Sequence, residues 1–135
     1  MTRYLLDTNI VSDLVRFPLG RVMQRIQNVG EAQVCISIIV AAELRYGAER
    51  RRPSRLTTQV ERVLGDLVVL PLEAPVDELY GVLRTRLERA GRTISGNDLL
   101  IAAHALTLGC TVVTDNEGEF RRIEELPVEN WLRDG

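Results

Sequence analysis

The chain has 135 residues and a mass of 15.2 kDa, which fits one domain of the usual size of about 100 to 200 residues. Hydrophobic residues make up 45% of the sequence and charged residues 27%, and this balance excludes an intrinsically disordered chain. The formal net charge of −2 argues against a nucleic-acid coat protein, because phosphate binding normally draws on excess positive charge.

Short apolar runs alternate along the chain with longer segments whose apolar residues recur at helical spacing. The short runs predict strands at residues 3–6, 34–36, 67–70, 111–113 and 128–131. The longer segments predict helices at residues 10–15, 21–29, 38–51, 54–66, 76–90 and 97–108. Strands separated by helices form parallel sheets whose right-handed crossovers cover both faces. We therefore expect a three-layer α/β/α sandwich around a mostly parallel sheet, in a single domain of residues 1–135.

None of these segments suits a membrane. No apolar run reaches the roughly 18 to 20 residues that span a bilayer, and the opening MTRYLLDTN lacks the apolar stretch and cleavage site of a signal peptide. We therefore expect a cytoplasmic protein that makes no membrane contact.

Several polar residues fall where an open parallel sheet binds its ligands, beyond the carboxyl ends of the strands. Asp7 directly follows the first predicted strand, and Asp115 and Asn116 follow the fourth. Asp98 lies at the mouth of a very apolar predicted helix, and Glu43 lies among apolar residues early in another. Alone, Asp7 suits a helix N-cap, Asp98 a capping box and Glu43 a solvated helix face. Their joint occurrence favours a shared site.

Carboxylates that converge on one rim repel one another unless a cation neutralises them, and hard oxygen ligands select Mg²⁺ or Mn²⁺. Such an ion lowers the pKa of a bound water and stabilises the charge of an in-line phosphoryl displacement. The cluster therefore favours a metal-dependent phosphodiesterase.

Four short motifs follow one another along the chain. They are LDTN at residues 6–9, AELxxG at 42–47, NDLLIAAHA at 97–105 and VTDNxxEF at 113–120. Each motif is weak alone, but the ordered set is specific, and it covers essentially the whole chain up to VENW at residues 128–131. In the identity and order of these motifs, the sequence resembles the VapC-type PIN-domain toxins of type II toxin–antitoxin systems.

The resemblance implies a PIN fold and a Mg²⁺-dependent endoribonuclease, with Mn²⁺ as an alternative ion. It implies an acidic quartet at Asp7, Glu43, Asp98 and a fourth position, with Asp7 and Asp98 as the principal metal ligands. It also implies a cognate antitoxin that covers the site and inhibits the enzyme, and a tendency to form homodimers.

The fourth acidic position is where the sequence departs from the family pattern. Counted back from Phe120, the usual acid falls on Asn116, whereas the neighbouring acid is Asp115. We take Asp115 as the fourth catalytic acid, with Asn116 as a supporting residue that can still hold a metal-bound water. Asn9 and Thr114 are expected to orient the carboxylates by hydrogen bonds.

The only histidine, His104, lies two helical turns past Asp98 in an alanine-rich helix. A general base is one interpretation, but a lone helical histidine is more often packed than catalytic. The resemblance makes it a family feature without assigning it a role.

Basic charge is concentrated in one stretch. All 17 basic residues are arginine, and the six between Arg45 and Arg62, set against two glutamates, give that stretch a charge of +4. We expect Arg45, Arg50, Arg51 and Arg52 to contact RNA or the antitoxin.

Two other function classes fit parts of the pattern. A structure-specific DNA nuclease could use the same acids, but it generally needs extra elements to hold duplex or flap DNA, and none is visible. A receiver-like binding module could hold Mg²⁺ in an acidic pocket, but the chain has no lysine to complete that pocket.

Overall fold

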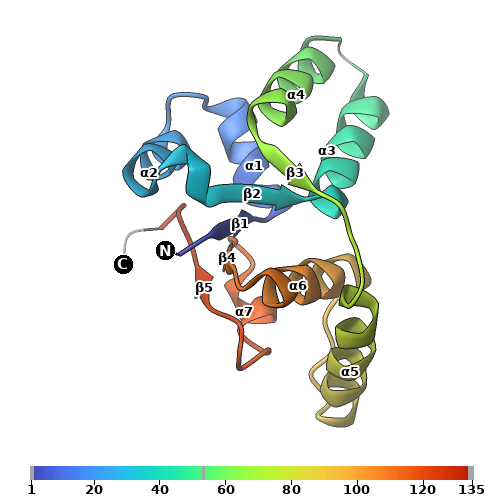
Figure 1. The fold of residues 1–135 in the computed structure, drawn as a ribbon. Helices are drawn as coiled ribbons and strands as arrows, with labels where there is room; N and C mark the ends of the chain where they lie inside the picture. Colours follow the sequence, from blue (N-terminus) through green and yellow to red (C-terminus); the bar gives the residue numbers. More distant parts are fainter. Residues whose placement is uncertain (1, 53, 134–135) are drawn as a thin grey trace.

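Five short parallel strands form the centre of the computed structural model, which describes residues 2–52 and 54–133. The strands are β1 (Tyr4–Leu6), β2 (Val34–Ser37), β3 (Val68–Leu70), β4 (Thr111–Val113) and β5 (Val128–Glu129). They lie in the order β3-β2-β1-β4-β5 (Figure 1). β2 and β4 are buried along their whole length, as expected for parallel strands covered on both faces.

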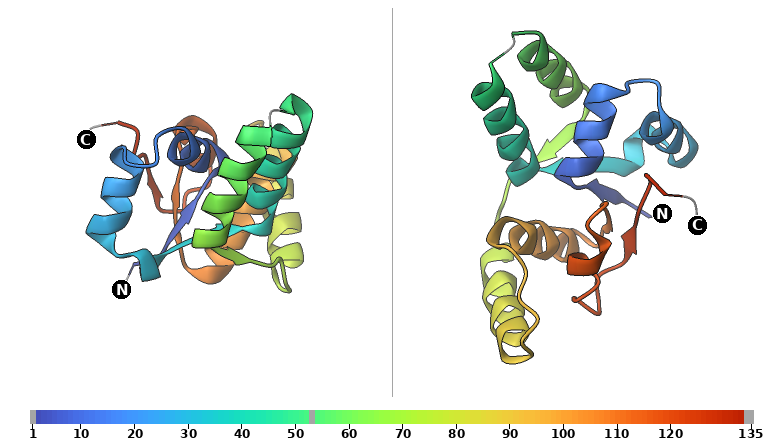
Figure 2. Two further views of the ribbon diagram at one scale, coloured as in Figure 1. Left: turned by 90° about the horizontal axis from the view of Figure 1, so that it is seen from above. Right: turned by 180° about the vertical axis from the view of Figure 1, so that it is seen from behind.

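Helices cover both faces of this sheet. They are α1 (Thr8–Arg16), α2 (Arg21–Val29), the 3₁₀ turn η1 (Glu31–Gln33), α3 (Ile38–Arg51), α4 (Ser54–Asp66), α5 (Val76–Arg89), α6 (Gly96–Leu108) and α7 (Glu117–Phe120). Helices α1 to α4 lie on one side and α5 to α7 on the other (Figures 1 and 2). The chain moves outward from β1 to β3 and then returns across the sheet to β4 and β5, so right-handed crossovers place the two sets on opposite faces. The predicted α/β/α sandwich is confirmed.

The apolar spacing that predicted the helices also decides which of their faces are buried. In α1 the buried residues are Ile10, Val11, Leu14 and Val15, which form one stripe along the helix. In α6 the consecutive residues from Ile101 to Ala105 are all buried, so this helix is enclosed on nearly every side. Asp98, in its first turn, is thereby held at a fixed place relative to the sheet.

The predicted last strand, residues 128–131, is shorter in the structure and ends at Glu129. The Asn130 side-chain oxygen accepts the backbone N–H of Leu132 at 2.9 Å, a local hydrogen bond that competes with strand pairing. Trp131 is nevertheless buried, and its ring centroid lies 5.4 Å from that of Tyr4.

Two short elements, η1 and α7, were not expected from the sequence, because three or four residues are too few to show a helical period. Within residues 2–52 and 54–133, no helix combines the length and hydropathy needed to cross a membrane.

Candidate active site

The order of strands in the sheet reverses between β1 and β4, because the chain runs from β1 toward β3 on one side and from β4 toward β5 on the other. Loops diverge at such a point and leave space beyond the carboxyl ends of the strands. Asp7 follows β1 directly, and Thr114 to Asn116 follow β4. The backbone N–H of Asp7 donates to the Val113 carbonyl at 2.8 Å, which fixes these two loops side by side.

Asp7 is 3% exposed and caps the N-terminus of α1. Its Oδ1 accepts the backbone N–H of Thr8 at 2.8 Å, and its Oδ2 accepts the Thr114 hydroxyl at 2.7 Å and the Asn9 amide at 3.3 Å. Burial raises the pKa of Asp7, and the nearby Glu43 charge raises it further, although the bonds from Thr114 and Thr8 act in the opposite direction. Asp7 therefore serves as the N-cap of α1 and also belongs to the carboxylate group.

Glu43 reaches the same place from α3. The Thr8 hydroxyl donates to Glu43 Oε1 at 2.6 Å, so the residue next to Asp7 in the chain orients the second carboxylate. Glu43 is half-buried, in agreement with a position that faces the carboxyl edge of the sheet rather than open solvent.

Asp98 and Glu119 complete the group. Burial, a hydrogen bond with Glu119 and the charges of Asp7 and Glu119 raise the pKa of Asp98 to about 7. The Asn116 amide nitrogen donates both to Asp98 Oδ2 at 3.1 Å and to Glu119 Oε2 at 3.0 Å. Four carboxylates thus form a chain of electrostatic contacts, in the order Glu43, Asp7, Asp98 and Glu119.

Asp115 points elsewhere. Its side chain is exposed, accepts the Asn130 amide at 3.0 Å and lies 3.5 Å from the Arg133 guanidinium. Only its backbone N–H faces the site, where it donates to Asn9 Oδ1 at 2.9 Å. The structure therefore brings Asp7, Glu43 and Asp98 together, with the expected supporting residues, and places the Asp115 carboxylate outside that group.

Thr8 and Glu119 are the site residues that sequence reasoning missed. The signal for Glu119 was its spacing, because it comes three residues after Asn116, which precedes α7; the helix itself has too few residues for a periodic pattern. The signal for Thr8 was weaker, since a threonine after a capping aspartate has no special feature in sequence.

A model of the PIN domain family matches residues 4–126 of the chain. The chain is 38% identical over 134 residues to "Ribonuclease VapC2" of Haemophilus influenzae, covering 98% of this chain and 100% of that protein. It is 34% identical over 132 residues to "tRNA(fMet)-specific endonuclease VapC" of Shigella flexneri, covering 97% and 99%. The chain belongs to the VapC ribonucleases of the PIN-domain family.

Solved structures of the VapC family have the same fold. The VapBC2 structure of Rickettsia felis, bound to a promoter DNA fragment, matches with a TM-score of 0.89 and 34% identity over 96% of this chain and 99% of that one. DNA-bound VapBC of Salmonella typhimurium gives a TM-score of 0.89, also at 34% identity, over 97% and 99%. The fold of the chain therefore agrees with the family that the ordered motifs predicted.

The donor chemistry of the four carboxylates suits the metal ion on which PIN-domain ribonucleases depend. All are hard oxygen ligands, and their crowding raises the pKa of Asp98, which a divalent cation would reverse. Within residues 2–52 and 54–133, no three Asp, Glu, His or Cys side chains already stand at metal-binding spacing. Asp98 and Glu119 are instead bridged by the Asn116 amide, and their proximity is one of the causes that raise the pKa of Asp98.

His104 is 2% exposed and lies outside the carboxylate group. Its Nδ1 lies 2.9 Å from the Ser37 hydroxyl, which caps α3 by accepting the Ile39 backbone N–H at 3.1 Å. Its other nitrogen bonds to the Pro71 carbonyl, and burial lowers its pKa. A neutral ring can donate to the Pro71 carbonyl and accept from the Ser37 hydroxyl, so both ring nitrogens have a hydrogen-bond partner. His104 thereby links α6 to the ends of β2 and β3.

The four expected contact arginines of α3 and its C-terminus have different surroundings. Arg45 forms an ion pair with Glu61 of α4. Arg50 and Arg51 line a pocket that also contains Thr8 and Glu43. Arg52 ends α3 in a left-handed conformation with φ of 56° and is exposed.

Proposed function

We propose that this chain is the toxin of a type II toxin–antitoxin system and that it hydrolyses phosphodiester bonds of RNA as a metal-dependent endoribonuclease. The observation that carries the proposal is the chain of four carboxylates at the carboxyl edge of the sheet, where the pKa of Asp98 is raised to about 7. Clustered acids with raised pKa values are typical of catalytic and metal sites. The names of the relatives support the same reaction and substrate class.

We assign the metal to Asp7 and Asp98, with Glu43 and Glu119 beside them, and Mg²⁺ or Mn²⁺ as the ion. When bound, such an ion supplies a water of lowered pKa and stabilises negative charge on the phosphate. The protein supplies orientation: Thr8 holds Glu43, and Thr114 and Asn9 hold Asp7. Outer hydrogen bonds of this kind fix the angle at which a carboxylate meets its ligand.

We further propose that Glu119, and not Asp115, is the fourth acid. Asn116 donates to Glu119 and Asp98 through one amide nitrogen, so it acts as a positioning residue between two acids. Asp115 is held by Asn130 and Arg133 on the outer side of the loop. Asp115 is adjacent in sequence to Asn116, so its negative charge can still add to the electrostatic attraction of a metal ion from a distance.

The partners follow from the same relatives. Structures of related proteins are VapBC toxin–antitoxin complexes, and this supports a cognate antitoxin that inhibits the enzyme in the cytoplasm. The homodimer stays a prediction, which sedimentation of the purified chain, alone and with its antitoxin, would test.

The deciding experiment incubates the purified chain with single-stranded RNA and with DNA of the same sequence, in Mg²⁺, in Mn²⁺ and with a chelator. We expect cleavage of RNA that needs the metal, and no cleavage by the Asp98→Asn variant. Cleavage of DNA at an equal rate would favour the structure-specific DNA nuclease. Mg²⁺ binding without cleavage of either nucleic acid would favour a binding module, and in both cases the ribonuclease proposal would be wrong.

A further inference from the structure

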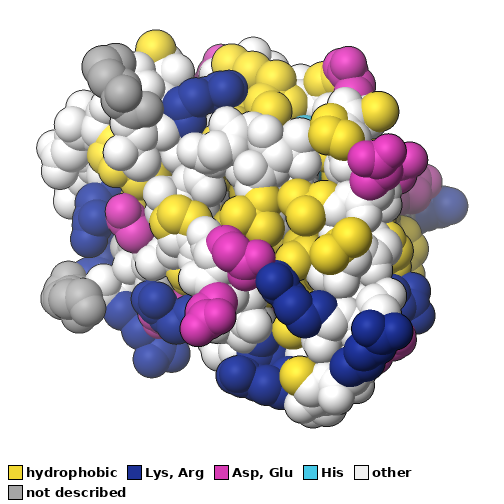
Figure 3. All heavy atoms as spheres, turned by 60° about the horizontal axis from the view of Figure 1, so that its bottom comes forward, with side chains coloured by type: hydrophobic (Ala, Val, Ile, Leu, Met, Phe, Trp, Pro, Cys, Tyr) yellow, Lys and Arg dark blue, Asp and Glu magenta, His cyan; other side chains and the backbone are white. Residues whose placement is uncertain are grey.

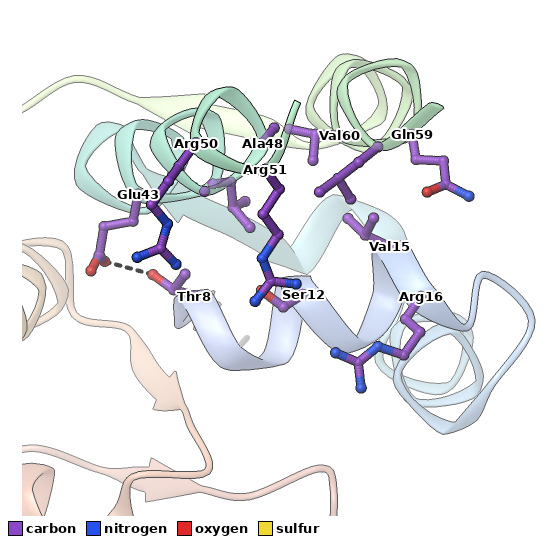
Figure 4. Close-up of a pocket in the computed structure, with 13 residues that line it drawn as sticks. Thr8, Ser12, Val15, Arg16, Glu43, Ala48, Arg50, Arg51, Gln59 and Val60 are labelled. Carbon is purple, nitrogen blue, oxygen red and sulfur yellow. Dashed lines mark hydrogen bonds between the residues drawn. The ribbon is translucent and has the colours of Figure 1, made fainter. Parts of the chain in front are cut away.

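A pocket of about 270 Å³ adjoins the acidic centre. It lies between α1, α3 and α4, and Thr8 and Glu43 form the end nearest the carboxylates (Figure 4). The pocket is therefore continuous with the place where the scissile phosphate would react. A substrate group bound in it would belong to the nucleotide next to the scissile linkage.

Three arginines line this pocket from two helices. Arg50 and Arg51 extend from α3 toward α1, and Arg16 comes from the last turn of α1 (Figure 4). Ser12 and Gln59 add a hydroxyl and an amide to the same lining. These side chains are hydrogen-bond donors, and guanidinium groups match phosphate oxygens in a two-pronged geometry.

None of these three arginines forms an ion pair within the described part of the chain. Arg16 and Arg50 instead lie over aromatic rings, 6.0 Å from the Phe17 centroid and 5.6 Å from the Tyr46 centroid. Other arginines do have carboxylate partners: Arg45 with Glu61, Arg84 with Glu88, Arg86 with Glu125, Arg121 with Glu117 and Arg133 with Asp115. On the face seen in Figure 3, basic and acidic side chains are likewise interspersed.

Three unpaired like charges that line one pocket favour an anion. The pocket is also bounded by apolar side chains, among them Leu44, Leu56 and Val60, which suit the face of a ribose or base. Its volume of about 270 Å³ lies just below the range of about 300 to 1,000 Å³ that is typical of ligand sites, so it suits one nucleotide and is too small for a folded partner.

We propose that this pocket binds a non-scissile phosphate of single-stranded RNA, next to the phosphate that is cleaved at the acids. The inference rests on the proposed ribonuclease function and adds the place where the substrate is held. The acidic centre repels the RNA backbone, so a positive subsite beside it offsets that repulsion and sets which linkage reaches the carboxylates. It assigns Arg16, Arg50 and Arg51 to RNA and leaves Arg45 and Arg52 outside.

The test uses RNA substrates in which one phosphate at a time is replaced by an uncharged methylphosphonate. Wild-type protein and the double variant Arg16→Gln/Arg51→Gln are compared by kcat/KM on each substrate. The control is Arg89→Gln/Arg92→Gln, which removes two exposed arginines, one at the end of α5 and one just after it, that form no ion pair with another described residue. Thermal unfolding confirms that all three proteins are folded.

For the wild type and the control we expect a roughly tenfold loss of kcat/KM, about 1.4 kcal/mol of barrier, at one linkage beside the scissile one. The Arg16→Gln/Arg51→Gln variant should show that loss on unmodified RNA and no further loss when the same linkage is neutral. For this variant, the slope of log affinity against log salt concentration should become less steep by about 0.7 for each lost phosphate contact.

Two results would overturn the inference while the ribonuclease function stands. One is equal sensitivity of the double variant and the wild type at every linkage. The other is unchanged RNA cleavage by a double variant that its co-expressed antitoxin no longer inhibits, which would make the pocket a protein contact. Absence of any RNA cleavage by the wild type would instead overturn the proposed function itself.

Discussion

Asp7 is held by donors from two distant parts of the chain, Thr8 and Asn9 in the first turn of α1 and Thr114 beyond β4. A carboxylate fixed in this way cannot turn away from its like-charged neighbours, and its burial raises the cost of keeping it ionised. The protein thus keeps an arrangement that is unfavourable for stability in the absence of a cation, which is what a functional site requires.

We expect Asp7→Asn and Asp98→Asn each to abolish metal-dependent RNA cleavage and to leave the fold intact, because each removes a charged metal ligand. Without metal, both variants should be at least as resistant to urea as the wild type, since one repelling charge is gone. Cleavage rates and urea unfolding measure the two effects. Asp77→Asn, at an exposed position on α5, is the control, and wild-type cleavage by both site variants would contradict the assignment.

The fourth acid is tested by three further substitutions. Glu119→Gln should raise the Mn²⁺ concentration needed for half-maximal cleavage strongly, because it removes a carboxylate from the electrostatic chain. Asp115→Asn should stay within about tenfold of the wild-type rate, or about 1.4 kcal/mol of barrier, since its side chain is held by Asn130 and Arg133. Asn116→Ala should fall between them, because it frees both Asp98 and Glu119.

Cleavage rates measured against Mn²⁺ concentration separate these cases. A large rise in the metal requirement of Asp115→Asn alone would restore Asp115 as the fourth ligand. A collapse for Asn116→Ala alone would show that the amide itself takes the family's acid position.

At the scale of elements, His104 shows how α6 is fixed to the sheet. Its ring bonds to Ser37, the cap of α3, and to the carbonyl of Pro71 after β3. Asp98 and Glu43 lie on the two helices that this contact joins, so the ring determines their relative position without touching substrate.

We therefore expect His104→Ala to destabilise the protein by about 2 kcal/mol or more, through a cavity and unsatisfied polar groups. His104→Asn, whose amide can replace part of the bonding, should cost less. The pH profile of RNA cleavage by folded protein should be unchanged in both. Loss of one limb of that profile at unaltered stability would identify His104 as a general base and contradict the structural role.

Most elements of this fold could be predicted from the sequence, because apolar periodicity reports directly which face of a helix or strand is buried. The helix at residues 21–29 and the strand at residues 111–113 have the bounds that the pattern indicated. The short helical elements η1 and α7 could not be predicted in this way because they have too few residues to show a period, and the early end of β5 could not because a local side-chain bond of Asn130 determines it.

The acids were predictable for a different reason, since strand ends are visible in sequence and converge in any parallel sheet. The direction of a side chain in the loop after a strand is not visible. Thr114 points to Asp7, Asp115 points outward and Asn116 points to Asp98, and only the folded loop reveals this alternation. The sequence therefore favoured Asp115, whose carboxylate the folded loop directs away from Asp7 and Asp98.

At the scale of the whole molecule, the acidic centre links stability to pH. The pKa of Asp98 is 3.8 in its ordinary state and about 7 in the folded protein, so between these values the folded state binds more protons here than the unfolded chain. Its contribution to stability is complete below the lower value and is lost as the pH rises through the upper one. His104 acts in the opposite sense, because burial lowers its pKa.

In the presence of a chelator, the free energy of unfolding of the wild type minus that of Asp98→Asn should fall as the pH rises from about 4 to 7. The subtraction cancels His104, which lies outside the carboxylate group. Urea unfolding at a series of pH values measures it, and saturating Mg²⁺ should remove most of the slope. A difference that stays constant with pH in the chelator would show that the folded protein does not raise the pKa of Asp98.

The strand order has a further consequence for how a cell makes this protein. Asp7 and Glu43 leave the ribosome early, whereas Asp98 and Glu119 belong to α6 and α7, near the end of synthesis. Until β4 is made, β1 is the open edge of a three-stranded sheet, and until α6 is made two of the four acids are missing. A nascent chain, or one cut short by premature termination before α6, therefore has no complete nuclease centre. While the ribosome translates the messenger RNA that encodes this enzyme, the unfinished chain therefore lacks the residues it would need to cleave that RNA.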